Sequence, residues 1–107
     1  MKAKEGDRVG AILSADKEVV KFLGYGKYLG NVIPTKEEGV TMMGMDMHEI
    51  CTERNFGNPC IELENGKRVY GCECWWGTEA KVIEILKGRR VEIVNIEDAR
   101  RPLEACA

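Results

Sequence analysis

Polar and apolar side chains alternate most clearly in the middle of the chain, on either side of Asn65-Gly66. The segments 60–64 and 67–75 show the period of two that is typical of half-buried β-strands. An Asn-Gly pair between two such segments indicates a hairpin with a two-residue type I′ turn, because this turn needs positive φ at both positions. We therefore predict a β-hairpin in which residues 67–75 form one continuous strand.

A second hairpin is predicted near the N-terminus. Residues 9–13 and 18–23 are rich in β-branched and aromatic side chains, and residues 14–17 between them have the composition of a turn. A helix capped by Ser14 is the alternative, because several apolar side chains after it would fall on one helical face. We favour the hairpin, since β-branched and aromatic residues are enriched in strands.

Two segments are predicted to be helical. Thr78 has the N-cap residue type and precedes an amphipathic segment, residues 79–87, that Gly88 would end. A shorter helix is expected from Asp46 to Arg54, because an acidic residue follows the Asp46 cap three positions later, as in a capping box.

Residues 91–96 carry apolar side chains on both faces, which predicts an inner strand rather than an edge strand. Strands and helices are segregated along the chain, which indicates the α+β class with a mostly antiparallel sheet. A chain of 107 residues has the length of a single domain. We expect residues 1–107 to form a small, strongly bent, SH3-like sheet with one helix in the C-terminal half and a short second helix.

Three glycines, Gly24, Gly26 and Gly30, superficially suggest a phosphate-binding loop. The dinucleotide-binding motif needs G-x-G-x-x-G at the start of a helix, whereas here the third glycine comes one residue late. Residues 31–34 also do not favour a helix. The glycines are better explained by a bent strand, where they allow a bulge or the close approach of another backbone.

The composition excludes some classes of protein. Charged residues make up 32% of the chain with a net charge of -2, so a strongly basic nucleic-acid-binding protein is not expected. Any nucleic-acid surface would have to use Lys87, Arg89, Arg90, Arg100 and Arg101. The sequence has no apolar run of membrane-spanning length and no secretory signal, so we expect a cytoplasmic protein without membrane contacts.

The five cysteines are an odd number and do not match a dense disulfide framework, so we expect free thiols in a reducing compartment. Zinc is the one cofactor considered, because thiolate and imidazole are its ligands. Its candidate ligands are His48, Cys51, Cys72 and Cys74. The C-x-C spacing within a strand departs from that of zinc ribbons and fingers, which favours core thiols instead.

A cysteine-based enzyme is a third alternative. Cys51 or Cys60 could act as a nucleophile with His48 as the base, but no pattern of residues specifies a reaction. We therefore lean against an enzyme and expect no catalytic residue.

The predicted strand divides its side chains by face. Tyr70, Cys72, Cys74 and Trp76 would share the core face, whereas Glu73 and Trp75 would point outward. Beside Tyr25 or Tyr28, an outward Trp75 would form an aromatic patch suited to a ligand or partner, unless the following loop and helix cover it.

Four of the five methionines lie within residues 40–47. Methionine fills irregular gaps in cores and also adapts to partner surfaces, so this segment is either a core edge or a contact surface that uses Met42 and Met45. We expect a self-associating interaction module or small-molecule-binding module, with a small molecule or a protein as its partner. A zinc-stabilised protein and a cysteine-based enzyme are the alternatives.

Two stretches, residues 63–77 (LENGKRVYGCECWWG) and residues 10–26 (GAILSADKEVVKFLGYG), resemble small uncharacterised bacterial proteins of the mobile gene (integron) cassette type. This resemblance implies a small cytoplasmic protein that forms a homo-oligomer. No activity belongs to this type of protein, so the resemblance supplies no catalytic residue.

Overall fold

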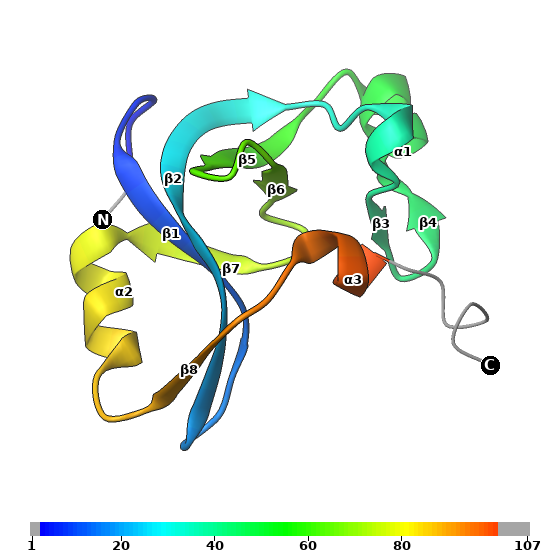
Figure 1. Ribbon diagram of the computed structural model, residues 1–107. Coiled ribbons are helices and arrows are strands. Elements are labelled where there is room, and N and C mark those ends of the chain that lie inside the picture. The colour runs from blue at the N-terminus through cyan, green and yellow to red at the C-terminus, as the bar shows by residue number, and fades with distance from the viewer. Residues whose placement is uncertain (1–2, 101–107) are drawn as a thin grey trace, which may run out of the picture.

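The computed structural model, which describes residues 3–100, is a mostly antiparallel sheet with a few short helices (Figure 1). The strands are β1 (Arg8–Ala15), β2 (Val19–Val32), β3 (Thr41–Met42), β4 (Met45–Asp46), β5 (Asn58–Leu63), β6 (Arg68–Tyr70), β7 (Trp75–Thr78) and β8 (Arg90–Ile93). The helices are the 3₁₀ turn η1 (Lys36–Glu38), α1 (Met47–Arg54), α2 (Glu79–Leu86) and α3 (Ile96–Arg100). The predicted α+β class is confirmed.

The long strand β2 connects the sheet. The strand order is β6-β5-β2-β1-β7, and β8 pairs in parallel with the first residues of β2. β1 pairs with the first part of β2 and β5 with its last part, both antiparallel. Figure 1 shows β2 curving from the β1 turn to the side where α1 and the separate β3–β4 hairpin lie.

The N-terminal hairpin is confirmed, and the helical alternative for residues 14–23 is wrong. The carboxylate of Asp16 accepts hydrogen bonds from the backbone N–H groups of Glu18 and Val19, both at 2.8 Å. This side chain therefore satisfies the backbone of the turn and lets β2 start at Val19.

The bend of β2 depends on its glycines, as the sequence indicated. A Cβ atom on Gly26 would lie 2.2 Å from the carbonyl oxygen of Glu62 in β5, so only glycine allows this contact between strands. Gly30 has a φ of 82° and lies where the β2–β5 register shifts, between Tyr28 and Asn31. The glycines therefore serve the bend and the strand contact, and their spacing needs no phosphate-binding loop to explain it.

The hairpin around Asn65-Gly66 exists, but its predicted type I′ turn is wrong. Of the two residues only Gly66 has positive φ, at 88°, and its N–H donates to the carbonyl oxygen of Leu63 at 2.9 Å. The N–H of Leu63 in turn donates to the carbonyl of Lys67 at 2.8 Å. This pattern is that of a three-residue loop, in which a type I turn is followed by a left-handed glycine.

The continuous strand predicted for residues 67–75 is also wrong. β6 ends at Tyr70, the chain turns over residues 71–74, and β7 begins at Trp75. The N–H of Glu73 donates to the carbonyl of Tyr70 at 2.9 Å, and the Glu73 carboxylate accepts from the Tyr70 N–H at 3.1 Å. This reciprocal pair closes the turn in place of the single predicted strand. Tyr70 is nevertheless buried, and Cys72, Cys74 and Trp76 pack against the core as predicted.

Both predicted helices are confirmed. The Thr78 hydroxyl accepts from the Lys81 N–H at the start of α2, and the Asp46 carboxylate accepts from the His48 N–H at 2.9 Å at the start of α1. α1 ends at Arg54 and is capped by Asn55, whose φ of 53° is left-handed.

β8 differs from its prediction. Among residues 3–100 it pairs only with β2, so it is an edge strand and not an inner one.

Three clusters of buried apolar side chains lie under the sheet and helices. One joins β1, β2, β5, β6 and α3, the second joins α1, β5 and β6, and the third lies between β1, β2 and α2. Val82 of α2 and Cys51 of α1 anchor their helices in these clusters. Both α1 and α2 are therefore held against the sheet by apolar contacts.

The glycine at the β2–β5 contact gives a stability prediction. Replacing Gly26 with alanine places a methyl group against the backbone of Glu62, so we expect a loss of about 2 kcal/mol or more in the free energy of unfolding, measured in urea. Gly39→Ala is the control, because no atom lies within 4 Å of a Cβ there and only its φ of 66° opposes the change. We expect about 1 kcal/mol for this control, and equal losses would contradict the close-contact explanation.

Candidate functional site

Glu73, predicted to point outward, forms a buried ion pair instead. Arg100 Nε lies 2.9 Å from Glu73 Oε1 and Arg100 Nη2 lies 2.5 Å from Oε2, and the two side chains are only 13% and 9% exposed. Arg100 Nη2 also donates to the carbonyl of Arg68. Burial opposes the charge of Arg100, but the hydrogen bonds and charge of Glu73 outweigh burial and raise the pKa of Arg100. This pair connects α3 to the turn before β7.

Tyr70 adds a second polar link to the same region. Its ring is fully buried, and its hydroxyl donates to Glu38 Oε1 at 2.7 Å. That oxygen also accepts from the backbone N–H of Thr35 at 2.8 Å in the capping box of η1. Burial, with the Glu38 hydrogen bond, raises the pKa of Tyr70. The hydroxyl therefore stays protonated and acts as a donor.

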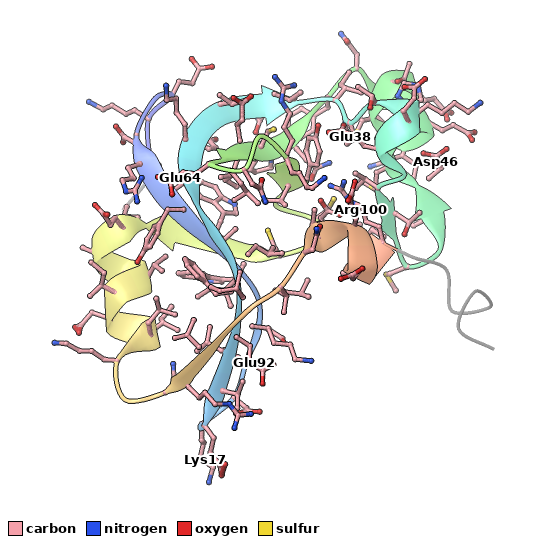
Figure 2. The ribbon with its side chains drawn as sticks, viewed as in Figure 1. Lys17, Glu38, Asp46, Glu64, Glu92 and Arg100 are labelled. Carbon is pink, nitrogen blue, oxygen red and sulfur yellow. The ribbon has the colours of Figure 1, made fainter. Side chains whose placement is uncertain are left out.

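An open cavity of about 320 Å³ lies beside this network. Its charged lining residues are Glu37, Glu38, Glu97, Lys67, Arg68 and Arg100. Figure 2 shows Glu38 and Arg100 on the same side of the molecule, near α3. Because three acidic and three basic side chains line the cavity, its charge selects neither an anion nor a cation.

The zinc candidates do not come together. Cys51 and Cys72 contact one core cluster, whereas Cys74 contacts another. His48 Nδ1 lies 2.7 Å from the carbonyl oxygen of Pro34, and Cys51 Sγ accepts from Asn58. Within residues 3–100, no three His, Cys, Asp or Glu side chains are placed to hold a metal ion.

The thiols have the character of core residues. Burial raises the pKa of Cys60 and of Cys72, and it raises the pKa of Cys74 to about 12. A nucleophilic cysteine needs the opposite shift, because the thiolate is the reactive form. His48, the base of the cysteine-enzyme alternative, hydrogen-bonds to a carbonyl instead of a thiol.

The predicted aromatic patch is divided between separate contacts. Tyr28 stacks on Trp76, with ring centroids 4.7 Å apart, and Tyr25 packs edge-on against Phe22. The guanidinium of Arg8 lies over the Tyr25 ring, 4.7 Å from the ring centroid. Tyr25 and Tyr28 are therefore occupied by partners within the chain.

Trp75 is exposed and lines an open groove of about 460 Å³ between β7 and α2. This groove also contains Trp76, Lys81 and Glu84. A role for Trp75 in binding a ligand or partner stays a prediction.

Exposed apolar side chains also gather on the β3–β4 hairpin and on β8. Met42 and Met45, both predicted contact residues, are exposed on the β3–β4 hairpin together with Met43. On the edge strand β8, Val91 is 39% and Ile93 is 74% exposed. The β8 surface was missed because its apolar residues suggested burial, although the alternation of charged and apolar residues from Arg90 onward is also typical of an exposed edge.

Comparison of the chain with known protein families, with curated proteins and with solved structures finds no match. In the part of the chain that is described, no helix has the length and hydrophobicity needed to cross a membrane.

The ion pair predicts a large and specific effect on stability. In Glu73→Gln the Arg100 charge stays buried without its counter-charge, so we expect the free energy of unfolding to fall by about 3 kcal/mol. Glu62→Gln is the matched control, because the Glu62–Arg68 pair is exposed and should contribute less than about 1 kcal/mol. Urea unfolding followed by tryptophan fluorescence measures both, and similar small losses would contradict a structural role for the pair.

The raised pKa values of the buried thiols predict slow alkylation in the folded protein. Near neutral pH, Cys60 and Cys74 should be almost wholly neutral, because burial raises both pKa values, and iodoacetamide should label them far more slowly than after unfolding. Mass spectrometry of the separate peptides distinguishes the individual cysteines. Rapid labelling of Cys60 in the native protein would revive the cysteine-enzyme alternative.

Proposed function

We propose that this protein is a self-associating interaction module, in which two copies join along the open edge of β8. One observation carries this proposal. Within the described part of the chain, β8 pairs with β2 on one side only, and it exposes two large aliphatic side chains, those of Val91 and Ile93. Soluble proteins usually protect such an edge with charges, bulges or a covering segment. A second copy of the chain is a partner that would cover it.

The hydrogen-bonding direction of β8 is set by its contacts with β2. The N–H of Arg90 donates to Glu18 at 2.8 Å and the N–H of Val94 donates to Phe22 at 3.0 Å. Because backbone groups alternate in direction along a strand, those of Val91 and Ile93 point to the open edge. Another strand could therefore pair with β8 through these two residues.

The two faces of β8 differ in chemistry. Arg90 Nη2 lies 3.0 Å from Glu92 Oε2, so these side chains share one face. Val91 and Ile93 consequently occupy the opposite face. A strand that pairs with β8 would meet alternating charges on one face and aliphatic side chains on the other.

The charges on two copies of β8 are complementary when the strands pair antiparallel in one particular register. With Val91 opposite Val91 of a second copy, Arg90 of each copy lies opposite Glu92 of the other. A shift of the partner strand by two residues in either direction places Arg90 opposite Arg90 or Glu92 opposite Glu92, which is unfavourable. The favoured register gives a two-fold symmetric dimer, the commonest form of homo-oligomer.

Other features support this proposal. The resemblance to cassette proteins also implies a homo-oligomer, and the bent path of β2 between β1, β5 and β8 supports an SH3-like arrangement. Free thiols at Cys51, Cys60, Cys72 and Cys74 support a place in the reducing cytoplasm. The edge is short, so the dimer is expected to be weak and concentration-dependent.

A charge exchange tests the register. Arg90→Glu and Glu92→Arg should each weaken dimerisation about tenfold or more, because each places two pairs of like charges opposite one another. The double variant Arg90→Glu/Glu92→Arg should restore it, since the opposite pairs re-form in exchanged positions. Sedimentation equilibrium from micromolar to millimolar concentration measures the dissociation constants.

Lys36→Glu on η1 is the control, because it changes the net charge as Arg90→Glu does but lies at an exposed position outside β8. It should leave the dissociation constant unchanged. A strict monomer at every concentration, or a double variant no better than the single ones, would overturn the proposal.

A further inference from the structure

We propose that the β3–β4 hairpin is a binding site for a soft monovalent metal ion of the Cu(I) type, held by the thioether sulfurs of Met42, Met43 and Met45. This site is separate from the β8 edge. Figure 1 shows the hairpin beside α1, on the opposite side of the molecule from α2 and β8.

Two of the sulfur-bearing side chains are brought together by strand pairing. Met42 lies directly opposite Met45 in the antiparallel register of β3 and β4. Directly opposite residues point to the same face, with Cβ atoms about 5 Å apart. Both side chains are exposed, at 38% and 47%, and each has three rotatable bonds, so the two sulfurs can converge on one ion.

The turn of the hairpin carries a third thioether, that of Met43, at a position where methionine is rare. Met43 and Gly44 have φ angles of 54° and 80°, which are those of a two-residue type I′ turn. Asparagine or glycine is favoured at the first position, and the left-handed conformation is unfavourable for methionine.

Met43 is also 90% exposed, so burial does not compensate for this cost. A strained, exposed apolar residue at a hairpin tip is better explained by a role in binding than by stability.

The donor set selects the kind of ion. Thioether sulfur is a soft, uncharged donor that suits Cu(I) and does not suit hard ions such as Mg²⁺ or Ca²⁺. The adjacent carboxylate, Asp46, already accepts the His48 N–H at the start of α1. Because thioethers carry no proton at physiological pH, binding at this hairpin should not depend on pH between mildly acidic and neutral values. Binding by His48 or a cysteine thiol would depend on pH, because those groups must lose a proton.

Ag(I), an air-stable ion with the same preference for sulfur, is the probe. The full chain is first treated with iodoacetamide under native conditions so that accessible thiols do not compete. During titration with silver nitrate in chloride-free buffer, the ε-methyl NMR signals of Met42, Met43 and Met45 should shift and saturate at one ion per chain. The ε-methyl signal of Met47, which is buried in the core, should not shift and serves as the internal control.

The double variant Met42→Leu/Met45→Leu removes two sulfurs while keeping the size and apolar character of the side chains, so its fold should be unchanged. We expect it to lose the saturable shift of the remaining Met43 signal. Shifts that never saturate, shifts that persist in the double variant, or a strong pH dependence would overturn the proposal.

Discussion

The ion pair between Glu73 and Arg100 holds together the part of the fold that the sheet leaves unconnected. β6 and β7 lie at opposite ends of the strand order, so no ladder of backbone hydrogen bonds links them. The short chain between them is instead fixed by the Glu73 carboxylate, which binds the Tyr70 N–H on one side and the Arg100 guanidinium on the other. Because both charges are nearly excluded from water, each depends on the other, and α3 is held in place by the same contact.

The long strand β2 decides which surfaces remain open. It pairs with β1, β5 and β8, and its glycines let β5 approach closely where it bends. The strands at the margins are short, and among the described residues β8 pairs on one side only. On the outer side of β6, the Tyr70 N–H and the Arg68 carbonyl bond to the side chains of Glu73 and Arg100. The molecule therefore presents the edge of β8 and a small separate hairpin, β3–β4, at its surface.

Local signals in the sequence were sufficient for the elements they govern. The caps Thr78 and Asp46 correctly placed both helices, and Asn65-Gly66 placed a hairpin, because each effect acts within a few residues. The strand over residues 67–75 failed because the partner that stabilises its turn, Arg100, lies 27 residues away in the sequence. The same distance effect applied to the candidate site: Met42, Met45 and Trp75 are exposed, whereas the Tyr28–Trp76 stack and the Arg8–Tyr25 contact come from tertiary packing that periodicity does not reveal.

The position of Met43 also determines how the hairpin responds to oxidants. A thioether that is almost fully accessible is converted readily to a sulfoxide, whereas Met47 in the core is shielded. The sulfoxide is polar and presents an oxygen, a harder donor than sulfur, so oxidation would change the chemical character of the hairpin tip without disturbing the core. Methionine sulfoxide reductases reverse this change. The oxidation state of the Met43 sulfur therefore depends on the oxidants and reductases around the protein.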